Sequence, residues 1–329
     1  MPTTITVATF NAENLFTRFK FKGKRVKNPP GSAKKYRYVP YTPTELEAAT
    51  AKSFVIDTKA FSRTMEDVRL LTAKALKAVR ADIVGLQEVE NLDTLKLFNS
   101  RYMRSRRFPY QYLIDGNDPR LIDVGLLSRY EIDFLRTHQF TKSGRSGVFS
   151  RDCLEAYVRI AGGTVLPVLV NHFKSMMGGR AQTKARREGQ VEEMIDILKG
   201  LFGTNYGDSD FVVVGDLNDY MEDGLHSESS IRKLLTSSQM ENVVDRLPKD
   251  QRWTHYYHRE KSYHQLDYIL ISRSLARKNP TVKPVIERRG QPLRVNRPGQ
   301  PKRVSSFFPE VKKKLKASDH CPVAITLKV

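Results

Sequence analysis

Short apolar segments alternate with amphipathic segments along the whole chain. The apolar segments are rich in β-branched residues and are bounded by Gly, Asn or Asp, which is typical of β-strands. They lie near residues 5, 82, 123, 154, 165, 211 and 266 and at the C-terminal end, 322–329. Apolar residues recur on one helical face over 64–80 and over 184–202, which predicts amphipathic helices. The pattern therefore predicts a layered α/β fold.

The sequence of 329 residues shows neither a low-complexity linker nor an internal repeat, so we expect one domain over 1–329. Two stretches, near 17–43 and 279–316, are longer than ordinary loops and are predicted to be loop insertions in that domain. No apolar run approaches the roughly 18 residues that a membrane span needs. The first residues lack the basic and apolar regions of a secretory signal, so we expect a cytoplasmic protein.

The charge of the chain indicates what kind of partner it has. Lys and Arg number 56 against 36 Asp and Glu, which gives a net charge of +20. Much of the surplus falls within 18–37 and 277–316, so both insertions are predicted to be basic. A surplus of this size attracts polyanions, and we expect an acidic partner. Cys153 and Cys321 are the only cysteines, which excludes a disulfide framework and a multi-cysteine zinc site.

Polar and acidic residues lie at the ends of several predicted strands. They are Asn11, Glu13, Glu88, Asn171, His172, Asp216, Asn218 and Asp219, with Asp319 and His320 just before the last strand. Function in layered α/β folds collects at such strand ends. Taken singly, each residue has a structural explanation: the 215–219 segment can be a turn, and a lone histidine is more often structural than catalytic. The combination is what indicates a catalytic site.

Seven short segments resemble, in order, the motifs of the endonuclease/exonuclease/phosphatase superfamily. They read TFNAENL at 9–15, LQEVE at 86–90, DVGLLS at 123–128, NHFKS at 171–175, GDLND at 215–219, QLDYILIS at 265–272 and SDH at 318–320. The resemblance spans residues 5–329 and omits mainly the two basic insertions. It implies a four-layered α/β sandwich, in which two packed mixed β-sheets are flanked by helices.

The resemblance also implies a metal site and a catalytic group. Glu88 is similar to the family's main metal carboxylate, with Asn11 and Asp319 as further ligands. These hard oxygen ligands are the kind that Mg²⁺ prefers, and Mn²⁺ can substitute for it.

His320 resembles the histidine that activates or orients the attacking water, and Asp267 the carboxylate that holds its ring. Asp216 and Asn218 resemble the pair that positions the nucleophile and contacts the phosphate. In some members of the family the aspartate is the proposed base, and the sequence leaves Asp216 and His320 both open for that role.

Five residues are candidates for binding the substrate phosphate or for supporting that binding. His172 resembles the family's phosphate-binding histidine, although NHFKS is shorter than the family's N-x-H-x-K-S pattern. Asn171 and Lys174 flank it, and for Lys174 a plain strand-end lysine is an equally good interpretation. Arg151 lies where family members often carry an arginine near the phosphate. Asp123 precedes the GLL strand, and we expect it to orient His172 or another site residue.

The shared motifs do not choose the substrate. The basic insertions favour a long polyanion, because phosphate contacts supply most non-specific nucleic-acid affinity. We therefore expect an Mg²⁺-dependent nuclease, and more specifically a DNA endonuclease. The alternatives are a phosphoesterase of the same superfamily that acts on inositol phosphates or phospholipids, and a non-catalytic nucleic-acid-binding protein. The aromatic residues of 253–257 can stack on bases or pack beneath a loop, and nothing in the sequence indicates a membrane or a protein partner.

Overall fold

The structure is a computed structural model. It describes residues 3–15, 24–33, 35–39, 64–118, 120, 122–144, 146–221, 229–296 and 304–329. The chain divides into two compact units, Thr17–Val68 and a larger one formed by Met1–Phe16 with Arg69–Val329. The larger unit carries every candidate site residue.

The smaller unit contains an antiparallel hairpin of β2 (Lys24–Lys27) and β3 (Tyr36–Val39). The 17–43 stretch was predicted to be a loop, and the hairpin corrects that prediction for its described part. Four of its basic residues lie outside the described residues: Arg18, Lys20, Lys22 and Lys34.

Two six-stranded mixed sheets form the larger unit, as predicted. The first sheet has the order β17-β18-β1-β4-β6-β5. Its strands are β1 (Thr4–Leu15), β4 (Ile83–Val89), β5 (Tyr110–Leu113), β6 (Asp123–Ser128), β17 (Val285–Ile286) and β18 (Val323–Lys328). The second has the order β13-β16-β12-β11-β10-β7. Its strands are β7 (Glu131–Arg136), β10 (Cys153–Arg159), β11 (Val165–His172), β12 (Val212–Asp216), β13 (Met240–Asn242) and β16 (Asp267–Ser272).

Helices and two small hairpins complete the larger unit. The α-helices are α3 (Thr64–Ala78), α4 (Leu92–Tyr102), α5 (Arg180–Phe202), α6 (Arg232–Leu235) and α7 (Arg273–Lys278). The short 3-10 helices are η2 (Arg104–Arg106), η3 (Tyr206–Asp208), η4 (Val243–Arg246), η5 (Lys249–Gln251) and η6 (Leu293–Val295). The hairpins are β8 (Lys142–Ser143) with β9 (Ser146–Gly147) and β14 (His255–Tyr257) with β15 (Ser262–His264). None of the helices in the described part combines the length and the apolar character that crossing a membrane requires.

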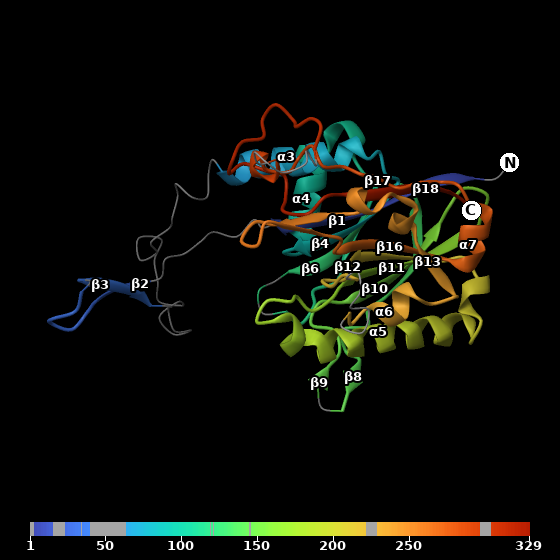
Figure 1. The fold of residues 1–329 in the computed structure, drawn as a ribbon, viewed down its shortest axis with the longest axis horizontal. Helices are drawn as coiled ribbons and strands as arrows, with labels where there is room; N and C mark the ends of the chain where they lie inside the picture. Colours follow the sequence, from blue (N-terminus) through green and yellow to red (C-terminus); the bar gives the residue numbers. More distant parts are fainter. Residues whose placement is uncertain are drawn as a thin grey trace. The chain divides into compact units, whose positions relative to one another are not determined.

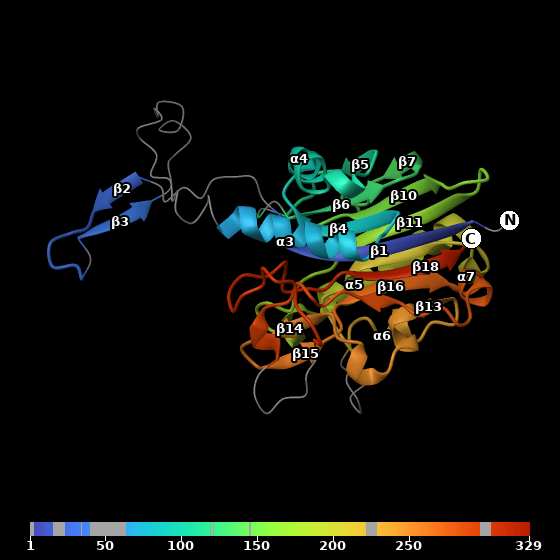
Figure 2. The same ribbon diagram turned by 90° about the horizontal axis from the view of Figure 1, so that it is seen from above.

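The apolar positions divide into three stacked cores, which makes the fold four-layered. Between the sheets, Val7 and Ile83 pack with Val170 and Val214. On the outer face of the first sheet, a second core lies beneath α3 and α4, and on the outer face of the second sheet a third core lies against α5. Figure 1 shows these layers in order, with α3 and α4 above the sheets and α5 below them, and Figure 2 shows α3 and α4 lying over the first sheet.

The described part of the 279–316 stretch is packed against the domain. Its β17 pairs with β18, and Phe308 and Val311 join Leu71 of α3 in a small apolar cluster. Apart from β17 and the short helix η6, the described residues of this stretch form loop that packs against the domain. The packing of this stretch brings the residues that precede β18 close to the ends of the other strands.

Strand pairing brings the motif residues to one edge. Parallel β1 and β4 place Asn11 opposite Gln87, one residue before Glu88. Parallel β11 and β12 place His172 opposite Asp216, and antiparallel β16 begins with Asp267 opposite Asp216. The carboxyl ends of parallel strands meet at the same edge of a sheet. The two sheets therefore present their polar ends together.

Arg187 of α5 ties together the two loops that follow β11 and β12. Its guanidinium is fully buried; it donates to the Lys174 carbonyl (3.3 Å) and lies 3.5 Å from Asp219 Oδ2. Asp219 also accepts hydrogen bonds from the Ser230 backbone N–H and hydroxyl. Because Lys174 and Asp219 follow His172 and Asn218 closely, this buried pair links the two loops that carry these candidate site residues.

The two sheets approach each other closely at Gly85, and this predicts the effect of two matched substitutions. A Cβ at Gly85 would lie 2.6 Å from Val214 Cγ2 and 3.0 Å from Val170 Cγ1. We expect Gly85→Ala to lower the free energy of unfolding by about 1–3 kcal/mol through overpacking. At Gly189 in α5, an added Cβ would meet no other atom within 4 Å. Gly189→Ala should therefore raise the free energy of unfolding by up to about 1 kcal/mol. Urea denaturation measures both changes, and equal effects of the two substitutions would contradict this packing.

A second prediction concerns the buried ion pair. Arg187→Met removes one of the two cations beside Asp219, which keeps its ion pair with Arg180 (2.7 Å), and should lower the free energy of unfolding by about 1–3 kcal/mol. The control is Arg186→Met, at an exposed neighbour on the same helix, which should change it by no more than about 0.5 kcal/mol. Chemical denaturation of the two variants tests the difference. Similar stabilities would show that Arg187 does not hold the loops.

Candidate active site

Asp216 is the centre of the candidate site. Its Oδ2 accepts a hydrogen bond from Asn11 Nδ2 (3.0 Å) and lies 3.6 Å from His172 Nε2 and 3.8 Å from His320 Nε2. Its Oδ1 accepts from the Asn218 backbone N–H (2.9 Å). Burial raises the pKa of Asp216 to about 7, with His320 opposing the rise. The end of β12 thus holds a carboxylate that contacts residues from both sheets and can exchange a proton near neutral pH.

His320 and Asp267 form the predicted pair. His320 Nδ1 lies 2.8 Å from Asp267 Oδ2, and Asp267 is fully buried. Burial opposes the charged ring, but Asp267 and Asp216 together raise the pKa of His320 well above its usual value. The turn that carries His320 is anchored to β1, because Ser318 Oγ donates to the Asn11 carbonyl (2.7 Å). The ring is therefore held between two carboxylates.

A cationic group lies on the other side of Asp216. The buried Arg151 donates to the Phe173 carbonyl (2.6 Å), and its Nε lies 3.1 Å from Asp118 Oδ2. Asn218 Nδ2 donates to the same carbonyl (3.1 Å). Burial lowers the pKa of His172 well below its usual value, and Arg151 adds to this, so the ring is neutral. Its Nδ1 has no hydrogen-bond partner among the described residues.

The predicted metal ligands Asn11, Glu88 and Asp319 all come to the ends of the first sheet. Glu88 Oε2 accepts a hydrogen bond from the Asn14 backbone N–H (3.0 Å). Burial raises the pKa of Glu88, and the negative charge of Asp319 raises it further. A cation beside two mutually repelling carboxylates relieves that repulsion, so these oxygens fit a hard divalent ion.

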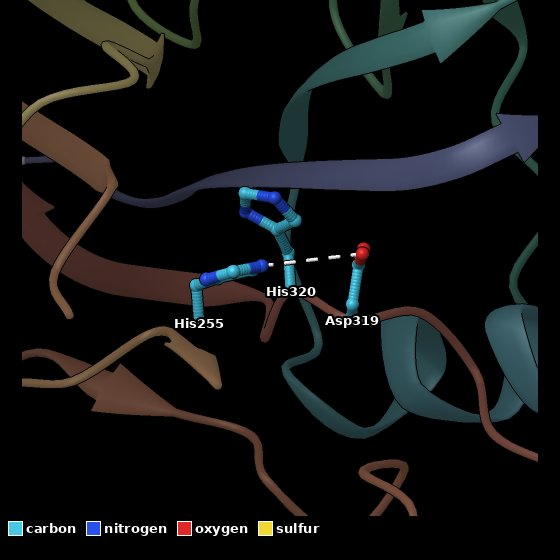
Figure 3. A group of neighbouring side chains, drawn as sticks. All are labelled: His255, Asp319 and His320. Carbon is cyan, nitrogen blue, oxygen red and sulfur yellow. Dashed lines mark ion pairs between the residues drawn. The ribbon is translucent and has the colours of Figure 1, made fainter. Parts of the chain in front are cut away.

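In the described part of the chain, another tight group of potential metal ligands contains Asp319 but neither Asn11 nor Glu88. His255, Asp319 and His320 each place one such atom within 4.8 Å of the others, as Figure 3 shows. The His320 ring is already held by Asp267, and its raised pKa disfavours the neutral form that a metal needs. The His255 ring packs against the His320 ring in a tilted arrangement, with centroids 4.7 Å apart, and burial lowers the pKa of His255 to about 3. We therefore assign this group to ring packing.

The backbone is strained where the site residues lie. Glu13, Asn14, Glu88 and Asn218 have φ values of 48°, 64°, 62° and 51°. Non-glycine residues rarely adopt this left-handed region, and such strain concentrates at functional sites. The strand pairing of β1 and β4 is irregular at the same place, between Asn11 and Leu15.

Two of the predicted residues take up other positions, and a third, Lys174, lies near Arg151. Asn171 pairs with Cys153 on β10, one position before His172, so alternation turns its side chain to the α5 face, away from the catalytic group. Asp123, predicted to orient His172 or another site residue, accepts a hydrogen bond from the Gly116 backbone N–H (2.9 Å) and thus holds the loop before Asp118. Burial lowers the pKa of Lys174, and the positive charge of Arg151 lowers it further.

Two residues outside the predicted set join the site. Glu13 and Lys316 form an ion pair of 2.6 Å at the metal side. Glu13 was noted as a strand-end residue, but Lys316 was hidden among the surplus lysines of a basic stretch. The aromatic residues before Asp267 divide: Trp253 and Tyr256 are buried in an apolar cluster, and only His255 reaches the catalytic ring.

Comparison with known proteins agrees with this fold. The model of the Endonuclease/Exonuclease/phosphatase family matches residues 60–320. No curated protein sequence matches the chain. Truncated Caenorhabditis elegans TDP2 is a similar solved structure, with a TM-score of 0.57, 16% identity and coverage of 99% of this chain and 98% of that one.

Two further solved structures share the fold. An endonuclease/exonuclease/phosphatase from Bacteroides vulgatus has a TM-score of 0.55 at 16% identity, with 99% of both chains covered. The human Nocturnin catalytic domain with bound sulfate has a TM-score of 0.56 at 14% identity, with 98% of this chain and 94% of that chain covered. At 14–16% identity, the likeness to these solved structures concerns the fold alone. The family model, in contrast, matches most of the chain, residues 60–320. The protein belongs to the endonuclease/exonuclease/phosphatase family.

Proposed function

We propose that the protein hydrolyses phosphodiester bonds of nucleic acid with the help of Mg²⁺, and that it is a DNA endonuclease. Members of the family are hydrolases that act on phosphoester bonds and generally depend on a divalent metal. The observation that carries the proposal is the convergence of Asp216, His320 and Arg151 at the ends of strands from both sheets.

Asp216 is the proposed base that takes a proton from the attacking water. A general base works best when its pKa lies near the operating pH, and the pKa of Asp216 is raised to about 7. His320, held by Asp267 and protonated, is then better suited to contact the phosphate oxygens or to protonate the leaving group than to accept a proton. This assignment chooses between the two bases that the sequence left open.

Arg151, His172 and Lys174 form the proposed phosphate side of the site. The Arg151 guanidinium is fixed by Asp118 and the Phe173 carbonyl, so it binds an anion without losing side-chain freedom. The neutral His172 ring can donate a hydrogen bond to a phosphate oxygen. A fold neighbour, human Nocturnin, has been crystallised with a bound sulfate anion, which is consistent with oxyanion binding by this fold.

Asn11, Glu88 and Asp319 would hold the metal in this proposal. A bound Mg²⁺ would neutralise charge on the scissile phosphate and stabilise the leaving oxygen. Asn11 links the two halves of the site, because its Nδ2 donates to Asp216 while its Oδ1 accepts from the Glu13 backbone N–H (2.9 Å). Asn11 thereby fixes the position of Glu13, on the metal side, relative to the proposed base Asp216.

The net charge of +20 favours nucleic acid over a small phosphate ester. A long polyanion engages many separate cations, whereas one inositol phosphate engages only those beside the site. Lys27, Lys35 and Arg37 line a hollow of the β2–β3 hairpin and are exposed. These residues supply further phosphate contacts in the proposed complex.

We expect His320→Gln to lower kcat on DNA by about 100- to 10,000-fold, because proton transfer and charge stabilisation at the phosphate are lost. Glu88→Gln should lower cleavage and raise the Mg²⁺ concentration needed for half the maximal rate. Both variants should retain DNA affinity, measured separately by fluorescence anisotropy. The control is Glu188→Gln, on the exposed surface of α5. Parallel loss of binding and cleavage would refute these roles.

The exposed cations of the hairpin generate a separate prediction. Changing Lys27, Lys35 and Arg37 together to Gln should weaken DNA binding and reduce the slope of log K against log salt by about 2 to 3. Binding measured between 50 and about 200 mM salt gives the slope. The catalytic constant should remain unchanged. An unaltered slope would mean that the hairpin does not contact the phosphates.

A further inference from the structure

Lys316 lies between two carboxylates at the metal side of the site. Its Nζ is 2.6 Å from both Glu13 oxygens and 3.9 Å from Asp319 Oδ2. The side chain is only 15% exposed and Glu13 only 30%, so the pair is largely withdrawn from solvent. The Glu13 backbone is held in the left-handed region and its N–H donates to Asn11 Oδ1. The ammonium is therefore fixed in place by the same strand end that carries a predicted metal ligand.

The local charges identify what Lys316 replaces. When ionised, Glu13, Glu88 and Asp319 carry three negative charges. The charges of His320 and Arg151 are offset by Asp267 and Asp118, so one ammonium and one divalent ion supply the three positive charges that balance these carboxylates. Without the ammonium, a single divalent ion leaves one negative charge unbalanced, and a second divalent ion beside Glu13 and Asp319 would be favoured. The 2.6 Å contacts show that Lys316 already occupies the space beside the Glu13 oxygens.

We propose that Lys316 acts as a tethered cation in place of a second divalent ion, so that the site binds one metal per chain and Glu13 is not a metal ligand. This inference rests on the proposed metal-dependent function. It assigns Glu13 a structural partner within the chain and leaves Asn11, Glu88 and Asp319 as the metal ligands. Lys316 is a positioning residue, since it acts on the metal through the two carboxylates.

Counting bound metal tests the proposal without reference to activity. The full-length protein is equilibrated with Mn²⁺, and the ions bound per chain are counted by electron paramagnetic resonance of the free ion. We expect one ion in the wild type, two in Lys316→Met, and one in the control Lys313→Met, whose lysine is exposed on the same segment. Two ions in the wild type, or one ion with unchanged affinity in Lys316→Met, would overturn the proposal.

Two more variants keep the test decisive if Lys316→Met folds poorly. Glu13→Gln should still bind one ion, with less than a tenfold loss of affinity, because Glu13 is not a ligand. Loss of all binding in Glu13→Gln would overturn the proposal. The double variant Glu13→Gln, Lys316→Met should return the count from two to one, because the second position loses its carboxylate. If the wild type binds one Mn²⁺ but cuts no nucleic acid, the substrate assignment fails while the tethered-cation assignment stands.

Discussion

Four carboxylates at or near the edge shared by the two sheets lie beside a cation, and this pairing is the constraint on which the rest of the structure depends. The pairs are Asp267 with His320, Asp219 with Arg187, Asp118 with Arg151 and Glu13 with Lys316. An unpaired carboxylate withdrawn from water costs several kcal/mol. The fold can therefore gather this much negative charge in one place only by drawing cations from distant segments. Glu88 and Asp319 lack a cation of comparable closeness, which is why these two are suited to an added metal ion.

The same constraint explains why the strand ends are irregular. Regular β-strands would point successive side chains to opposite faces, so neighbouring residues could not all reach one site. Left-handed backbone at Glu13, Glu88 and Asn218 turns the chain sharply at the sheet edge. The surrounding strands and cores hold this strain in place, and the site is thereby preorganised before substrate arrives.

Eight strands of the two sheets and the helices α3 and α5 followed from apolar periodicity, because packing between layers imposes that pattern, whereas the shorter or more exposed β5, β7, β13 and β17 were not predicted. Helix α5 begins at Arg180, four residues before the predicted start, since its polar first turn carries no apolar signal. Strand-end residues such as Asp216 and His320 were identified from motif order. Neither Arg187 nor Lys316 was predicted to be a buried ion-pair partner, because a sequence does not show which cations become buried partners. Asn171 was misplaced relative to His172 because motif resemblance ignores the alternation of faces along a strand.

The central claim is that the assembled site is a metal-dependent phosphodiesterase acting on nucleic acid. The most direct measurement incubates the wild-type protein with supercoiled plasmid, single-stranded DNA, RNA and inositol phosphates, each with Mg²⁺ or with a chelator. The account predicts nicking of the plasmid with Mg²⁺ and none with chelator. Release of phosphate from inositol phosphates without any cutting of nucleic acid, or cutting that persists in chelator, would contradict it.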